Sequence, residues 1–208
     1  MTANKLVLYS TNMEKQRNRK SNRDTVLQAA AHLFLTKGYQ LTSMDDVVDN
    51  SKVSKTNIYY HFKSKEELLL HIIDQFILHY QEQIDSVLSR ADLSVIDKLG
   101  SLLQIFVADN MQKDYLGGCP FLTFYTQVSN DSIEVQKKVR LFFEHQTDSL
   151  EKLLADAIQK KQIPEQTPVK QTASLIISSI EGGLFLAKAT NKPQLLNDVF
   201  TSLAFLLK

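Results

Sequence analysis

The chain has 208 residues, of which 43% are hydrophobic and 23% are charged, and its formal net charge is +1. This composition supports a buried core of one or two units and excludes a disordered acidic tail. The one cysteine, Cys119, excludes an intramolecular disulfide and a cysteine-built zinc site. Because no signal-type segment opens the chain and no apolar run approaches the ~18 residues of a membrane span, we expect a cytoplasmic protein without a membrane partner.

The charge is distributed unevenly along the chain. Residues 1–65 carry eleven lysines and arginines against five acidic residues, whereas residues 66–208 carry thirteen against eighteen. A basic first third predicts that this end contacts a polyanion, and the alternative is a solvated flexible tail. Residues 1–20 are polar and show no apolar period, so we expect a flexible basic arm there.

The next part of the chain predicts short helices joined by tight turns. Thr42, Ser54 and Ser64 can each cap a helix N-terminus, and for Thr42 we expect a capping box with Asp45. Gly38 can take the left-handed conformation that ends the preceding helix. Apolar residues at helical spacing then predict helices over about 21–38, 42–50, 54–60 and 64–88.

The remainder of the chain continues the helical pattern over longer segments. Glycine and proline interrupt the pattern near residues 117–120 and 164–168. The predicted helices cover about 96–107, 120–128, 132–158, 169–190 and 193–207. Nine helices, with no strand and no repeat at a fixed period, predict an all-α fold.

Residues 22–68 carry the strongest functional signal. Two short helices joined by a tight turn within a basic region are typical of a helix-turn-helix, whose second helix enters the DNA major groove. Here Ser54 opens that second helix. Because the first turn of a groove helix commonly meets base edges, we predict that Lys55, Thr56 and Asn57 read bases.

The same segment supplies candidate contacts to the DNA backbone. Tyr59, Tyr60 and His61 come later in the helix and are predicted to contact phosphate or sugar. The alternative for the tyrosines is packing in a small helical core, and for His61 it is capping or packing. Three further candidates stand at predicted helix N-termini, where free amides and the helix dipole attract a phosphate: Thr42, Ser43 and Lys65.

The motifs of this stretch resemble the DNA-binding signature of the TetR/AcrR repressor family. They are Thr42-Ser43-Met44, Val53-Ser54-Lys55 and Tyr59-Tyr60-His61-Phe62-Lys63-Ser64-Lys65-Glu66-Glu67-Leu68, preceded by Ala30-x-x-Leu33-Phe34-x-x-x-Gly38-Tyr39. The remainder resembles a subgroup with a Gly-Cys motif before its sixth helix and an Ile-x-x-x-Glu-Gly-Gly-like segment, here Ile177 to Gly183. One departure is the Ser51-Lys52 pair, where the family usually has a small residue and glycine. A lysine is disfavoured at a turn position that needs positive φ.

The resemblance implies a helix-turn-helix DNA-binding domain over residues 21–65 and a ligand-binding and dimerisation domain over residues 66–208. It also implies a homodimer that represses nearby genes until a small-molecule effector in the helical body releases it. A twofold protein places two recognition helices about one helical turn or somewhat more apart, so the double-stranded DNA operator is expected to be nearly palindromic.

Two groups of residues in the body are candidates for these implied roles. The last two helices carry more apolar surface than one small helical body can bury. We therefore expect a four-helix dimer interface, with two helices from each subunit, and ordinary core is the alternative. Aromatic residues at helical spacing are usually core, but an amphipathic or aromatic effector would need such a lining. The dimer candidates are Ile176, Ile180, Gly183, Leu184, Leu196, Val199, Phe200 and Leu203. The pocket candidates are Phe106, Cys119, Phe121, Phe124, Tyr125, Phe142 and Phe143.

Cys119 supports an alternative hypothesis, a repressor that senses electrophiles or oxidants through its thiol. Cys119 stands at the start of a predicted helix, where the dipole and free amides lower the pKa of a thiol. A small buried residue is the commoner fate of a lone cysteine.

Two other classes of protein compete with a regulator. A helical-bundle enzyme has little support, because the five histidines lack metal-ligand spacing and no glycine-rich phosphate loop is present. We therefore expect no enzyme activity, no metal and no cofactor. An adaptor that binds protein through its groove helix is distinguished by salt, since each neutralised phosphate adds about −0.9 to the log–log slope of DNA affinity.

Overall fold

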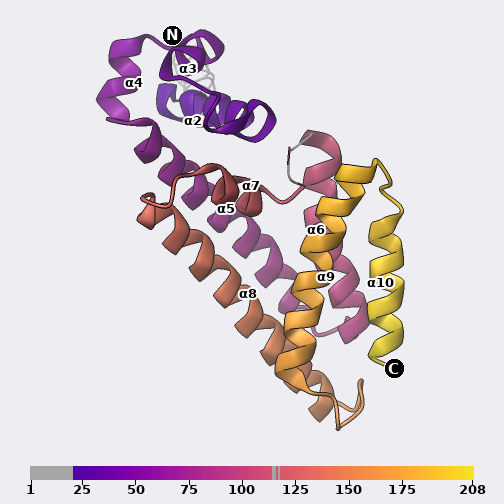
Figure 1. Ribbon diagram of the computed structural model, residues 1–208. Helices are drawn as coiled ribbons and strands as arrows, with labels where there is room; N and C mark the ends of the chain where they lie inside the picture. The colour runs from indigo at the N-terminus through magenta and orange to yellow at the C-terminus, as the bar shows by residue number, and fades with distance from the viewer. Residues whose placement is uncertain (1–20, 114–115, 117) are drawn as a thin grey trace, which may run out of the picture.

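The computed structural model describes residues 21–113, 116 and 118–208, and the predicted arm over 1–20 lies outside them. The described residues form nine α-helices and a π-helical segment, without a strand among them, which confirms the predicted all-α fold. A small head of three helices stands at one end of a larger helical body (Figure 1). The helices are α2 (Asn22–Leu33), extended by the π-helical segment η1 (Phe34–Gly38), α3 (Met44–Ser51), α4 (Lys55–His61), α5 (Lys65–Leu88), α6 (Val95–Lys113), α7 (Pro120–Gln127), α8 (Ile133–Gln159), α9 (Val169–Thr190) and α10 (Leu195–Leu206).

Local capping sets the starts of the head helices and of α5. Ser21, Ser54 and Ser64 each accept a hydrogen bond from the amide three residues further on, so the caps predicted at Ser54 and Ser64 are confirmed. Gly38 has a φ of +104°, which a residue with a Cβ rarely adopts, and the first helix ends there as predicted.

The capping box of α3 differs from the prediction by one residue. Ser43, not Thr42, is the N-cap, and its partner is Asp46, not Asp45. The Ser43 hydroxyl accepts from the Asp46 amide at 3.0 Å, and the Ser43 amide donates to the Asp46 carboxylate at 2.7 Å. Thr42 is unsuited to capping because its buried hydroxyl donates to the carbonyl of Gly38 at 2.8 Å.

The head has one apolar core to which all three of its helices and the start of α5 contribute. Full burial of each large side chain contributes about 1.5–3 kcal/mol. The core residues are Val26, Leu27, Ala30, Phe34, Val47, Val53, Ile58, Phe62, Leu68 and Leu69. Helix α5 supplies part of this core and then continues into the body, so one unbroken helix connects the head to the body (Figure 1).

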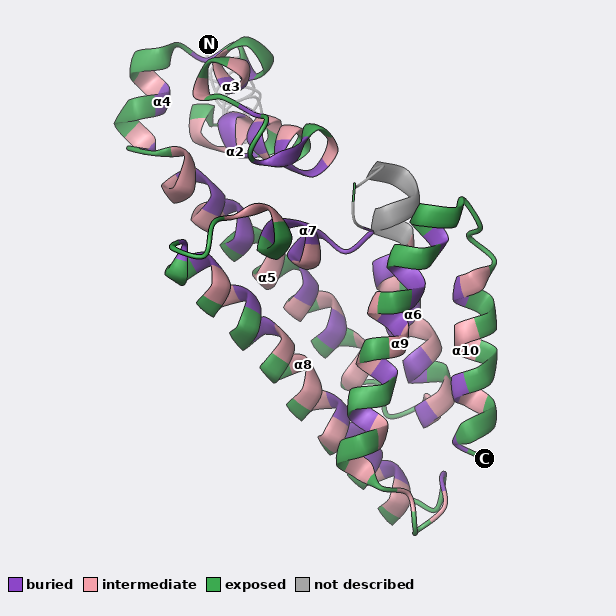
Figure 2. Ribbon diagram, viewed as in Figure 1, coloured by how far each residue is buried: buried purple, intermediate pink, exposed green. Residues whose placement is uncertain are grey.

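The body is organised around a cluster of aromatic rings between α5, α6, α7 and α8. Tyr80 of α5 is fully buried and stacks on Phe106 of α6 with 5.0 Å between ring centroids. Phe121 of α7 stacks on Phe142 of α8 and meets the Tyr80 ring edge-on. In Figure 2 the buried stripes of α5 and α8 run along the sides that face the neighbouring helices, as expected for amphipathic helices.

Helices α9 and α10 lie side by side at one edge of the body (Figure 1). By length and composition α9 is apolar enough to cross a membrane, which corrects the expectation that no segment comes close. Within the fold, α9 packs against α8 on one side and α10 on another, and it carries the acidic residue Glu181. Its apolar character therefore serves packing between helices.

Candidate DNA-binding surface and effector cavity

Helix α4 presents a polar and aromatic face to solvent. Ile58 is buried on its inner side, whereas Tyr59 and Tyr60 have exposed fractions of 42% and 81%. The alternative in which these tyrosines pack in the core is therefore wrong. Of the predicted base readers, Lys55 and Thr56 are exposed, whereas Asn57 is partly buried.

The exposed face of α4 is held in place by contacts to its neighbours. The Lys55 ammonium lies 2.7 Å from Asp45 of α3, and this hydrogen-bonded pair raises the pKa of Lys55. His61 is partly buried, and its ring meets the ring of Tyr60 edge-on at 5.0 Å. The predicted contacts of α4 with DNA stay a prediction. Thr56, Tyr59 and Tyr60 are exposed, whereas Lys55 would have to leave Asp45 to bind a base.

The three candidates at helix N-termini fare differently. Ser43 is exposed, but Thr42 is buried and its side chain cannot reach a phosphate, which corrects that prediction. The Lys65 ammonium donates to the carbonyls of Tyr39 at 2.9 Å and Thr42 at 3.0 Å, and it lies 4.3 Å from the centroid of the Tyr39 ring. Burial lowers the pKa of Lys65. In this structure Lys65 thus stabilises the turn before α3 through its two hydrogen bonds.

The turn between α3 and α4 keeps a left-handed residue although glycine is absent. Lys52 has φ 58° and ψ 18°, and its amide donates to the Val48 carbonyl. A residue with a Cβ pays roughly 1–2 kcal/mol for this conformation. The turn of the helix-turn-helix is thus preserved, with conformational strain at Lys52.

We predict that Lys52→Gly raises the free energy of unfolding by about 1 kcal/mol, because glycine adopts this conformation without strain but loses more entropy on folding. Urea denaturation of the full chain measures the change. Lys52→Ala is the matched control, since it removes the same ammonium and keeps the strain. A glycine variant no more stable than the alanine variant would contradict this explanation.

Helix α7 and the residue before its turn connect the body to the head. The Leu116 amide donates to the Leu35 carbonyl at 2.9 Å. Gln127 is the last residue of α7, and its side-chain oxygen accepts a hydrogen bond from the Tyr39 amide. Its backbone carbonyl accepts a second one, at 2.8 Å, from the side-chain amide of Gln40. The segment from Leu35 to Gln40 is therefore hydrogen-bonded to Leu116, which precedes α7, and to Gln127, the last residue of α7.

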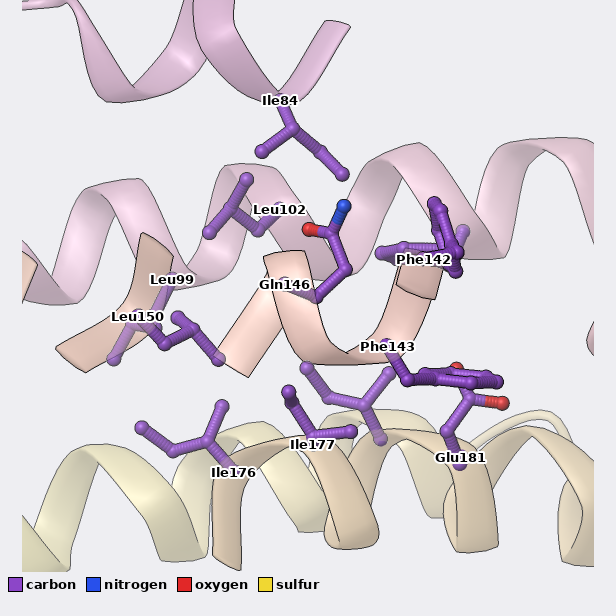
Figure 3. A pocket seen from close by; sticks show the side chains of 12 residues that line it. Ile84, Leu99, Leu102, Phe142, Phe143, Gln146, Leu150, Ile176, Ile177 and Glu181 are labelled. Atoms are coloured by element: carbon purple, nitrogen blue, oxygen red, sulfur yellow. The ribbon is translucent and has the colours of Figure 1, made fainter. Parts of the chain in front are cut away.

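A narrow cavity, here called the effector cavity, lies in the body between α5, α6, α8 and α9. The centre of a water molecule can reach about 40 Å³ inside it. Its wall consists of Ile84, Leu99, Leu102, Phe106, Phe142, Phe143, Gln146, Leu150, Ile176, Ile177, Ile180 and Glu181 (Figure 3). A small apolar ligand fits such a lining, with side-chain rearrangement for anything larger.

The pocket candidates divide between this wall and the core. Phe106, Phe142 and Phe143 line the cavity as predicted. Phe121 and Phe124 are fully buried in the aromatic cluster outside that wall, and Tyr125 is 48% exposed on α7. These three residues do not line this cavity, and their part in binding an effector stays a prediction.

Cys119 is completely buried at the N-cap of α7. Burial and the neighbouring Glu181 carboxylate raise the pKa of this thiol well above its usual range, and they outweigh the amides of Leu122 and Phe121. The expected lowering of its pKa by the helix N-terminus is therefore wrong. The residue before Cys119 has to be glycine. Gly118 has a φ of +79°, and a Cβ there would lie 2.7 Å from the Leu184 carbonyl oxygen.

Glu181 and Gln146 are the two polar residues of the cavity wall, and neither is among the predicted pocket candidates. Burial raises the pKa of Glu181 to about 7, against a smaller lowering by the hydrogen bond from the Cys119 thiol. The Oε2 atom of Glu181 and the Nε2 atom of Gln146 are buried without a hydrogen-bond partner. For Glu181 a signal was present, because an acidic residue interrupts an otherwise apolar helix.

The predicted dimer residues lie mostly inside the subunit. Ile176, Ile180, Gly183, Leu184, Leu196 and Leu203 are buried, and Val199 and Phe200 are partly buried. Ordinary core fits most of these positions, because this face of α9 packs on α8 and α10. Val199 and Leu203, however, line a shallow groove between α9 and α10 on the outside of the subunit, so their place in a dimer interface stays a prediction. The opposite faces of α9 and α10 expose other large apolar side chains, namely Leu175, Phe185, Leu186, Phe205 and Leu206.

Two family models match the chain. The model described as bacterial regulatory proteins, tetR family, matches residues 26–72, which include α3, α4 and the turn between them. The model described as tetracyclin repressor-like, C-terminal domain, matches residues 95–203, which include most of the body.

Relatives and solved structures match over most of the chain. An HTH-type transcriptional regulator in the lacX 3′ region of Lactococcus lactis is 30% identical over 88% of this chain and 91% of its own length. The HTH-type transcriptional repressor ComR of Escherichia coli is 25% identical over 77% of each chain. A crystal structure of a TetR transcriptional regulator from Chloroflexus aurantiacus superposes with a TM-score of 0.77 and 26% identity, covering 88% of this chain and 92% of that one. The chain therefore belongs to the TetR family of bacterial transcriptional regulators.

Proposed function

We propose that this regulator is a cytoplasmic repressor that binds a near-palindromic DNA operator as a homodimer and is released by a small molecule in the effector cavity. The observation that carries the proposal is the position of α7. Its N-cap, Cys119, contacts Glu181 of the cavity wall, and its last residue, Gln127, is hydrogen-bonded to the head at Tyr39. A ligand that moves α7 therefore changes the placement of the head.

Differential affinity is the thermodynamic requirement of this mechanism. The effector must bind the arrangement of heads that does not fit DNA more tightly than the arrangement that does. The narrowness of the cavity supports such a difference, because a ligand larger than the present space has to displace side chains of α8 or α9. Packed helices move as units, so this displacement is transmitted to their contacts.

The exposed apolar faces of α9 and α10 support the homodimer. Leu175 and Leu206 line one shallow groove between these two helices on the outside of the subunit. Gly182 lies on the same side of α9 with no atom within 4 Å of where its Cβ would be, so a second helix can approach closely there. Pairing two such faces in a twofold arrangement removes apolar surface from water.

Selection of bound sequences from random double-stranded DNA tests the proposed function. We expect one preferred site with twofold symmetry, and an affinity that falls steeply with salt, by about −0.9 in log–log slope for each neutralised phosphate. Recovery of unrelated sequences, or of a site without symmetry, would count against a homodimeric repressor.

We predict that Tyr60→Ala weakens binding to all operator variants alike, by about tenfold, because a contact to phosphate or sugar carries no sequence information. Thr56→Ala is expected to change the preference at particular base pairs, by about 1–3 kcal/mol. Fluorescence polarisation with an operator series measures both. Tyr125→Ala, an exposed tyrosine of the body, is the control and should bind like the parent. Equal losses across the series for both head variants would contradict the assigned roles.

A further inference from the structure

The effector cavity contains two polar atoms whose hydrogen-bonding capacity is unused. Glu181 Oε2 and Gln146 Nε2 are both buried and both lack a partner, and the other ten residues of the wall are apolar. Buried polar atoms in folded proteins almost always have partners, so two exceptions in one cavity require an explanation. A ligand group that fills the cavity is such an explanation.

The two side chains reach the cavity from different helices. Figure 3 shows the Gln146 amide projecting from α8 toward the space below Ile84, while the Glu181 carboxyl group rises from α9 beside the ring of Phe143. The Cys119 thiol donates to the carboxyl group of Glu181, yet Oε2 still has no partner. The arrangement thus offers one acceptor and one donor, separated by apolar side chains, to a single bound molecule.

The chemistry of the wall selects the charge of that molecule. No lysine, arginine or histidine is among the wall residues, so an anionic ligand finds no counter-charge and is repelled by Glu181. A cation instead gains a buried carboxylate, whose attraction is strengthened where water is excluded. Three phenylalanine rings also line the cavity, and a cation held over the face of such a ring is attracted by its quadrupole.

We propose that the effector cavity binds a compact apolar molecule with a protonated amine, whose ammonium donates to Glu181 and whose oxygen acceptor receives the amide of Gln146. The inference rests on the proposed function only in taking this cavity as the effector site. Compactness follows from the narrowness of the cavity, in which the centre of a water molecule can reach only about 40 Å³, so long alkyl chains do not fit without rearrangement.

The affinity for such an amine depends on pH. Burial raises the pKa of Glu181 to about 7, and the ammonium binds the ionised form. Among the described residues that face Glu181, Cys119 is the titratable group, its own pKa is raised, and the cavity side chains of α5, α6 and α8 carry no charge. Amine affinity therefore falls as the pH drops below about 7, and binding at pH 7 releases a proton.

Three probes of one shape test the proposed contact between an ammonium and Glu181: 2-phenylethylamine, 2-phenylethanol and phenylacetate. In calorimetric titrations of the full chain at pH 8, we expect the amine to bind at least about tenfold more tightly than the alcohol, and phenylacetate to bind more weakly than the alcohol. Glu181→Gln should reduce amine affinity to that of the alcohol and leave alcohol binding unchanged. Glu144→Gln, an exposed glutamate on α8, is the matched control and should keep the preference.

Proton release on binding is a second readout, and it shows whether Glu181→Gln loses recognition of the ammonium charge rather than its fold. Titrations at pH 7 in buffers of different ionisation enthalpy should show proton release for the parent and none for Glu181→Gln. The variant is expected to be at least as stable as the parent at pH 8. The pKa of Glu181 is about 7 in the folded state and 4.5 in the unfolded state, so unfolding releases a proton between these values. The free energy of unfolding therefore falls as the pH rises from 4.5 to 7. Glutamine does not titrate, so the variant does not lose this stability. Equal binding of amine and alcohol by the parent, absence of amine binding, or an amine preference that survives Glu181→Gln overturns the proposal.

Operator binding without any probe is measured in parallel. An intact, symmetric operator complex together with no amine preference overturns only the amine site. An amine preference that disappears in Glu181→Gln, with operator affinity unaffected by the amine, supports the site and overturns release by this ligand as its function.

Discussion

Replacing Leu175 by glutamate should convert the protein to monomers and lower its operator affinity by about a hundredfold or more. Leu175 is 47% exposed in the groove between α9 and α10, on the face that we assign to the homodimer. A glutamate there would be buried without a partner on association, which costs several kcal/mol and is not offset by the remaining apolar contacts. A monomer presents one recognition helix, so the contacts of the second half-site are lost.

Sedimentation velocity and fluorescence polarisation measure the two parts of this prediction. Leu141→Glu is a close control, because Leu141 is also a leucine within a long helix and is 48% exposed, but it lies on α8. That variant should remain dimeric and bind the operator normally. If both variants behave like the parent, the dimer uses another surface. If both dissociate, the effect does not arise from the α9–α10 face.

Truncation of Phe121 to alanine should lower the free energy of unfolding by about 3–5 kcal/mol. Phe121 has no exposed surface and stacks on Phe142, while Tyr80 and Phe76 meet its ring edge-on. Alanine would leave a cavity at the centre of the aromatic cluster, and the rings around it can close only part of the space. Chemical denaturation followed by circular dichroism measures the loss.

Tyr125→Ala is the control from the same helix. Its side chain is 48% exposed, so the change in stability should stay within about 1 kcal/mol. Comparable losses in the two variants would mean that helix propensity of α7, rather than packing of its inner face, determines the effect. A small loss for Phe121→Ala would show that the cluster refills the space.

The sequence predicts the head well because its signals are local. Serine caps at Ser54 and Ser64 and glycine at position 38 act within one turn of where they stand, and the helices begin and end there. The capping box of α3 was misplaced by one residue because Thr42 and Ser43 are chemically equivalent caps. Only the packing of Thr42 against the carbonyl of Gly38 distinguishes them.

The body was less predictable because apolar spacing identifies a helix face but not what covers it. Ile176 and Ile180 repeat at four residues as a dimer seam would, yet they face the effector cavity, and the exposed apolar face holds Leu175 and Leu186 instead. Cys119 illustrates the same limit. Its position at a helix N-terminus was correct, but its thiol pKa depends on burial and on Glu181, which is distant in sequence.

The unbroken length of α5 connects the two ends of the molecule mechanically. Leu68 and Leu69 anchor its first turn in the head core, and Ile84 near its other end lines the effector cavity. Twenty-four residues make a rod about 36 Å long, so a tilt of only about 5° pivoting at one end displaces the other by about 3 Å. In a twofold pair the two displacements add, and the gap between recognition helices then no longer matches the ~34 Å pitch of the double helix. In the proposed mechanism, a ligand too small to reach the DNA would thereby misplace both heads relative to the operator.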